Sequence, residues 1–184
     1  MKKSLIVVDC QYDFIDGSLA CLNAENAVNN IIDFVNSNDL KVVYSMDWHS
    51  NENKSFEVNG GIWPIHCVRG ERGSQIHEDF AKLIVTPENK PDAKNTFKKG
   101  QDDEIEEYSA YYARNEDGTQ INEYIDKEVV VSGIASEFCV RETILELLKN
   151  GFKVELLESG IGYVDEKEHL KNLAELKELG VTFV

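Results

Sequence analysis

The sequence has few of the features that separate domains. Only 3 of its 184 residues are proline, its 12 glycines are scattered, and no internal repeat is visible. Flexible connections between domains are usually rich in proline, glycine or serine, and no such stretch interrupts this chain. Hydrophobic residues make up 42% of the chain, which is enough for a full core at this length. We therefore predict one compact domain over residues 1–184.

Long hydrophobic runs are also absent. The apolar run near the N-terminus covers only residues 5–8 before it meets Asp9. A membrane-spanning helix needs about 20 apolar residues, and a signal peptide needs an apolar core of about 7–15. The sequence thus predicts a cytoplasmic protein with no membrane partner.

Positive charge is scarce, because 19 basic residues are set against 34 acidic ones and the formal net charge is −15. Such a surface repels the phosphates of nucleic acids and of anionic lipids, so binding to either would need a local basic patch. The densest basic spot, Lys98 with Lys99, is followed by three acidic residues at 102–104. We expect no nucleic-acid partner.

The four cysteines do not have the paired C-x-x-C spacing of metal-binding or redox motifs. In a cytoplasmic chain, irregularly spaced cysteines are more often free thiols than disulfide partners. We expect free thiols, at least two of them plain packing residues. The four are Cys10, Cys21, Cys67 and Cys139.

Runs rich in valine and isoleucine alternate with helical patterns. The spacing predicts strands at residues 4–8, 41–45, 129–132, 153–157 and 181–184, and helices at residues 23–36, 136–150 and 165–179. Strands that are apolar on both faces and alternate with helices predict an α/β fold, a doubly wound and mainly parallel sheet covered by helices on both sides. Residues 48–98 lack a regular pattern, and we expect them to build a site over the strand ends.

In such a sheet the ligand site lies beyond the carboxyl ends of the strands, where Asp9 and residues 133–139 fall. Partial desolvation at this place would raise the pKa of Asp9 toward that of a general base, although a capping role is the plain alternative; we interpret Asp13 as structural. If Ser136 caps the following helix, Cys139 lies in the first turn, where the helix dipole lowers a thiol pKa. The local sequence alone still favours Cys139 as a packing residue.

Asp47 and His49 lie just beyond a predicted strand, and alternate residues of an extended segment point the same way. With His66 they could hold one metal ion and leave positions open for water or substrate, as catalytic metal sites do. By itself the Asp-x-His pair is a weak signal. We interpret His77 and His169 as surface residues.

Short motifs follow one another along nearly the whole chain. They are Asp-x-Gln-x-Asp-Phe at residues 9–14, Asp-Trp-His at 47–49, Ser-Phe at 55–56, Trp-Pro-x-His-Cys at 63–67, Gly-x-x-Gly-Ser at 70–74, Lys-Gly at 99–100, Tyr-Ser-Ala at 108–110 and Gly-x-Ala-x-Glu-aromatic-Cys-Val at 133–140. Each motif is weak by itself. In this combination and order, the chain resembles the nicotinamidase branch of the isochorismatase-like cysteine hydrolases.

The resemblance implies a catalytic triad in which Cys139 is the nucleophile, Asp9 its base and Lys99 their charge partner. Of the two neighbouring lysines, Lys99 matches because it directly precedes the glycine of the Lys-Gly motif. The resemblance also implies a cis peptide bond before Ala135. The backbone N–H groups of Ala135 and Cys139 would then form the oxyanion hole.

The resemblance further makes Asp47, His49 and His66 the ligands of one divalent metal ion. We expect Zn²⁺ first, while Fe²⁺ and Mn²⁺ suit the same ligands. Some relatives add a fourth protein ligand between the two histidines, where this chain offers only Ser55 and Glu57. Three protein ligands plus water are therefore expected.

The activity implied is hydrolysis of nicotinamide to nicotinic acid and ammonia through a cysteine thioester, with pyrazinamide as a further substrate. Phe14, Trp63 and Ala135 would contact the substrate. The alternatives are a sibling amidohydrolase of the N-carbamoylsarcosine or ureidoacrylate type, and a catalytically silent binding domain. Sibling enzymes generally lack the metal ligands. A homo-oligomer, a dimer or larger, is possible in this family.

Overall fold

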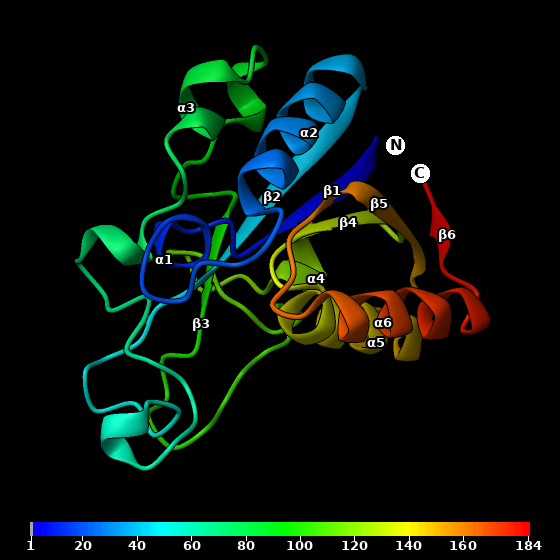
Figure 1. The fold of residues 1–184 in the computed structure, drawn as a ribbon. Coiled ribbons are helices and arrows are strands. Elements are labelled where there is room, and N and C mark those ends of the chain that lie inside the picture. Colours follow the sequence, from blue (N-terminus) through cyan, green and yellow to red (C-terminus); the bar gives the residue numbers. More distant parts are fainter. Residues whose placement is uncertain (1) are drawn as a thin grey trace.

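The computed structural model describes residues 2–184, which form a six-stranded sheet with helices packed against it (Figure 1). All strand pairs are parallel, and the strand order is β3-β2-β1-β4-β5-β6. The strands are β1 (Lys3–Val8), β2 (Leu40–Asp47), β3 (Thr96–Lys99), β4 (Glu128–Gly133), β5 (Lys153–Ile161) and β6 (Thr182–Phe183). The predicted doubly wound α/β fold is confirmed.

Six α-helices accompany the sheet within residues 2–184. They are α1 (Tyr12–Ile15), α2 (Ala24–Ser37), α3 (Asp79–Leu83), α4 (Ile121–Tyr124), α5 (Arg141–Lys149) and α6 (Glu166–Glu178). Three 3₁₀ turns (Glu57–Asn59, Arg72–Ser74, Pro87–Asn89) and one π turn (Ser136–Val140) complete the regular structure. Among the described residues, no helix is both long enough and apolar enough to cross a membrane.

The core consists of two apolar layers, one on each face of the sheet. Along the central strand β1, Leu5 and Val7 belong to the layer under α2, whereas Ile6 and Val8 belong to the layer under α5 and α6. Successive side chains of a strand point to opposite faces, so a continuous apolar run serves both layers. This explains why the strand sequences are apolar throughout.

The chain winds outward from the centre of the sheet in both directions. After β1 it adds β2 and β3 on one side, and after β4 it adds β5 and β6 on the other. The order therefore reverses between β1 and β4, the place where open parallel sheets bind ligands. Asp9 and the segment after β4 meet there.

Two local predictions were incomplete or wrong. Strand β3 was not predicted, because its four residues contain two lysines and end the irregular segment. The predicted helix over residues 136–150 does not begin with a Ser136 cap; Ala135 precedes a wide π turn over Ser136–Val140, and the α-helix begins at Arg141. The side chain of Ser136 is turned into the core, where it makes other hydrogen bonds.

Candidate active site

Four strand ends supply the central residues of the candidate site. Asp9 directly follows β1, Asp47 and Lys99 end β2 and β3, and Cys139 lies in the π turn after β4. The parallel register pairs Asp47 with Lys99, so the carboxylate and the ammonium come from adjacent positions. The three predicted triad residues therefore come together although they are far apart in sequence.

Lys99 lies at the centre of this group. Its Nζ is 2.9 Å from Asp9 Oδ2, 2.5 Å from Asp47 Oδ1 and 3.5 Å from Cys139 Sγ, and it also donates to the Glu107 carbonyl oxygen at 3.0 Å. Burial disfavours its charge, but the carboxylates of Asp47 and Asp9 outweigh this effect and hold the pKa of Lys99 well above its ordinary value. Lys99 therefore stays an ammonium.

Asp9 is fully buried beside the thiol. Its Oδ1 accepts a hydrogen bond from Ser45 Oγ at 2.6 Å. Burial raises the pKa of Asp9, while the charge of Lys99 opposes the rise. The expected desolvation of this carboxyl group is thus present, and a raised pKa suits a group that takes up and returns a proton.

The expectation that the helix start lowers the pKa of Cys139 is wrong. Burial raises the pKa of this thiol well above its ordinary value; Lys99 opposes the rise, and the carboxylates of Asp9 and Asp47 add to it. The thiol occupies a π turn deep in the site, and loss of solvent there is the largest cause of the raised pKa. Cys139 is accordingly a neutral thiol at rest, and a nearby base must remove its proton.

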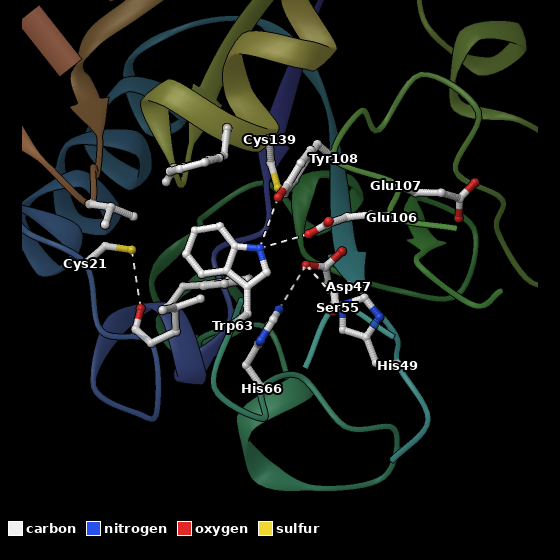
Figure 2. Close-up of a pocket in the computed structure, with 15 residues that line it drawn as sticks. Cys21, Asp47, His49, Ser55, Trp63, His66, Glu106, Glu107, Tyr108 and Cys139 are labelled. Atoms are coloured by element: carbon white, nitrogen blue, oxygen red, sulfur yellow. Dashed lines mark hydrogen bonds and ion pairs between the residues drawn. The ribbon is translucent and has the colours of Figure 1, made fainter. Parts of the chain in front are cut away.

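The three predicted metal ligands also converge (Figure 2). Asp47 Oδ2 lies 3.6 Å from His49 Nε2 and 4.0 Å from His66 Nε2, and one ligand atom from each residue lies within 4.8 Å of the others. His49 Nδ1 bonds to the Gly100 carbonyl oxygen and His66 Nδ1 to the Pro64 carbonyl oxygen, both at 2.8 Å. These bonds assign the proton of each ring to Nδ1 and leave Nε2 free to ligate.

The chemistry of this donor set fits a divalent cation. One carboxylate oxygen and two imidazole nitrogens, all buried, face a common point. Burial would raise the pKa of Asp47, but Lys99 and His49 hold it well below its ordinary value, so the carboxylate stays charged. The buried Ser55 Oγ lines the same pocket and has no hydrogen-bond partner among the described residues, which leaves it available to a ligand.

The predicted oxyanion segment has the expected backbone. The Ile134–Ala135 peptide bond is cis, which confirms that prediction. Ile134 N–H donates to Val8 and Ser136 N–H donates to Gly162, whereas Ala135 N–H has no acceptor within residues 2–184. A free N–H group beside the thiol is available to a substrate oxygen.

Aromatic side chains form the walls of the pocket. Phe14 and Trp63 line it together with Tyr108, Phe138 and the small Ala135; that Phe14, Trp63 and Ala135 contact the substrate stays a prediction. The Trp63 and Phe138 rings meet edge to face with centroids 5.0 Å apart. Flat apolar walls of this kind suit a planar aromatic ligand.

Two glutamates at the site were not predicted. The Trp63 Nε1–H group is shared between Glu106 Oε1 at 2.8 Å and the Tyr108 hydroxyl at 3.0 Å (Figure 2). Glu107 accepts the Gly100 N–H group at 2.7 Å. Only the neighbouring Tyr-Ser-Ala motif signalled this segment, because acidic residues are common everywhere in this sequence.

Other sequence predictions had mixed outcomes. Asp13 is structural as expected, since its Oδ2 accepts the Cys67 N–H group at 2.7 Å. All four cysteines are free in the described chain.

The placement of His169 on the surface is wrong, because only 9% of its surface is exposed and its Nδ1 lies 2.7 Å from Ser136 Oγ. His77 is partly exposed and contacts the Tyr12 ring.

Known proteins share both the sequence pattern and the fold. The isochorismatase domain matches residues 3–184. The chain belongs to the isochorismatase family. A nicotinamidase of Saccharomyces cerevisiae in this family is 31% identical to the chain, with 84% of this chain and 85% of the yeast protein aligned.

Solved structures of family members superpose over nearly the whole chain. A pyrazinamidase of Pyrococcus horikoshii in complex with zinc matches with a TM-score of 0.83 and 28% identity, covering 100% of this chain and 99% of that one. The yeast nicotinamidase bound to the inhibitor nicotinaldehyde matches with a TM-score of 0.85 and 28% identity, covering 99% of each chain.

Proposed function

We propose that this isochorismatase family member is a nicotinamidase, which hydrolyses nicotinamide to nicotinic acid and ammonia and also accepts pyrazinamide. The observation that carries the proposal is the position of Lys99. Its Nζ contacts Asp9, Cys139 and Asp47, and Asp47 also faces the two histidines. Lys99 therefore bridges one carboxylate of the proposed triad and one of the proposed metal ligands at the same aromatic pocket.

The triad would work by proton transfer followed by attack. Asp9 takes the proton of the Cys139 thiol, and the thiolate attacks the carboxamide carbon. Asp9 then protonates the departing ammonia, which leaves a thioester on Cys139. A water molecule that loses its proton to Asp9 attacks the thioester carbon, the C–S bond breaks and the carboxylic acid is released, and Asp9 returns the proton to the Cys139 thiolate. The Lys99 ammonium balances the negative charge, which lies on the Asp9 carboxylate before proton transfer and on the Cys139 thiolate after it.

The backbone would stabilise the tetrahedral intermediate. The N–H groups of Ala135 and Cys139 are the proposed donors to the oxyanion, and the unpaired Ala135 N–H supports this role. Phe14 and Trp63 would flank the planar ring of the substrate, as their positions along the pocket support.

Asp47, His49 and His66 would hold one divalent metal ion. Zn²⁺ is our first choice, supported by the zinc complex of the Pyrococcus relative, while Fe²⁺ and Mn²⁺ suit the same donors. When bound, the ion would anchor the ring nitrogen of the substrate and so orient the amide toward Cys139. The protein side chains would perform all the proton transfers.

The decisive experiment measures ammonia released from nicotinamide by the purified, metal-supplied protein. We expect activity in the wild type and a loss of about 10⁴-fold or more in Cys139→Ala, because Cys139 is the thiol that lies beside Asp9 and Lys99. Cys21→Ala is the matched control: it removes the other thiol that lines this pocket and should stay active, because Cys21 does not contact Asp9 or Lys99. An inert wild type that hydrolyses an N-carbamoyl compound would instead identify a sibling amidohydrolase.

A second experiment concerns the metal ion. We expect about one divalent ion per chain by mass spectrometry and a sharp loss of activity on chelation, restored by adding metal. His66→Asn should reduce the metal content because a buried ligand is lost, whereas His77→Asn should leave it unchanged. Full activity in protein freed of metal would contradict this assignment.

A further inference from the structure

A hydrogen-bonded cluster lies directly behind the π turn that carries Cys139. Its centre is the buried Ser136, which is 1% exposed. Ser136 Oγ lies 2.7 Å from His169 Nδ1, and Asn172 Nδ2 donates to Ser136 O at 2.8 Å and to Ser136 Oγ at 3.1 Å. Both partners belong to α6, so this helix is tied to the turn.

A second layer fixes the orientation of the Asn172 amide. Arg141 Nη1 donates to Asn172 Oδ1 at 2.7 Å, and Arg141 is itself paired with Glu175 at 2.9 Å. Because a guanidinium can only donate, the amide oxygen must face Arg141. The amide NH₂ group therefore faces Ser136 and donates to it.

The hydrogen bonds of the Ser136 hydroxyl indicate the protonation state of His169. Ser136 Oγ already accepts from Asn172, and its single proton needs an acceptor in this buried place. Within residues 2–184, the only acceptor paired with this hydroxyl is His169 Nδ1. His169 is accordingly neutral, with its own proton on Nε2.

Burial and the nearby charges have opposite effects on the pKa of His169. Burial lowers the pKa of His169 below its ordinary value of 6.5, while nearby glutamates oppose the change. The Tyr163 ring stacks on the imidazole with centroids 4.3 Å apart. The charged groups that act on His169 are three glutamates: Glu137 in the turn, Glu158 in β5 and Glu166 in α6.

The cluster is hydrogen-bonded to the backbone segment that carries the two proposed oxyanion donors. Ser136 directly follows Ala135, its N–H group donates to Gly162 at 2.9 Å, and Cys139 lies three residues later in the same turn. We propose that Ser136 and neutral His169 are positioning residues that hold the N–H groups of Ala135 and Cys139 in place for the reaction. This inference rests on the proposed amide hydrolysis.

The activity test compares variants that keep or remove the hydrogen bond. Asn at position 169 places an oxygen near the position of Nδ1, whereas Leu offers no acceptor. We expect His169→Leu and Ser136→Ala to lower kcat about ten-fold or more with little change in KM, because oxyanion donors act mainly in the transition state. His169→Asn and Ser136→Thr should restore most of kcat, and the exposed Lys167→Ala is the matched control.

A spectroscopic readout needs no turnover. The ¹⁵N shift of His169 Nδ1, assigned by its loss in His169→Asn, should be that of an unprotonated nitrogen at pH 7.5. A protonated Nδ1, or a folded His169→Leu protein with the wild-type kcat, would overturn the inference. If the wild type released no ammonia from nicotinamide, the proposed function would fail while the ¹⁵N shift still reported on the cluster.

Discussion

At the scale of single residues, the two adjacent lysines have different environments. Lys98 is half-buried with its Nζ 4.4 Å from the centre of the Trp48 ring, whereas Lys99 is buried between the carboxylates of Asp9 and Asp47. Neighbouring residues of a strand point to opposite faces, so only one of the two can enter the site. The position of Lys99 explains why two carboxylates can be buried together.

Replacing Lys99 should therefore affect stability as well as activity. Lys99→Met leaves Asp9 and Asp47 buried without their counter-charge, which costs about 3–5 kcal/mol of unfolding free energy. Lys98→Met is the matched control and should lower the unfolding free energy far less, because the Lys98 ammonium of the wild type lies near solvent. Urea titrations of both variants at pH 7 measure the difference, and equal losses would contradict this assignment of the buried charge.

At the scale of elements, the turn after β3 connects the triad to the metal-ligating set. Gly100 follows Lys99 with φ of +67°, and its carbonyl oxygen accepts the His49 Nδ1–H group. Its N–H group donates to Glu107, whose carbonyl oxygen receives the Lys99 ammonium. Glycine is required here because a Cβ atom would lie 2.4 Å from His49 Cε1.

Gly100→Ala should consequently weaken metal binding. The added methyl group must displace the His49 ring, and changes to groups that orient a ligand typically cost about 10–100-fold in metal affinity. Gly118→Ala is the matched control, since it has φ of +81° but no atom within 4 Å of the added Cβ. Competition with a chelator measures both affinities; equal metal retention would show that the turn does not orient His49.

At the scale of the whole molecule, the dominant feature is the excess negative charge. The net charge of −15 is spread over a chain whose one buried Lys among the described ion pairs, Lys99, joins Asp9 and Asp47. Repulsion between like charges on a folded surface lowers stability, and dissolved salt screens it. The acidic surface thus sets how the fold responds to its solvent.

Added sodium chloride should therefore raise the melting temperature at pH 7.5 by several degrees. The same salt should have little effect near pH 4.6, the isoelectric point of the sequence, where the net charge vanishes. Thermal unfolding followed by circular dichroism at both pH values tests this. A melting temperature that falls with salt at pH 7.5 would mean that attractive ion pairs dominate instead.

The sequence by itself determined five of the six strands of the sheet, because their signals are local; β3 was missed. Apolar runs such as residues 5–8 and the N-cap of α6, where the Glu168 N–H group donates to Asp165 Oδ1 at 2.9 Å, depend only on near neighbours. The position of Asp9 at a strand end was also predictable, since parallel strands place their carboxyl ends together. That Lys99 and Cys139 are the partners of Asp9 followed only from the order of the motifs.

Only the tertiary structure decided the environments of these groups. The pKa of Cys139 depends on burial and on the carboxylates of Asp9 and Asp47, which come from other strands, so a rule about helix starts gave the wrong direction. His169 lies on a helix with a charged sequence, yet its contact with Ser136 buries it. Burial and through-space charge depend on residues distant in sequence, and for that reason the fold alone determines them.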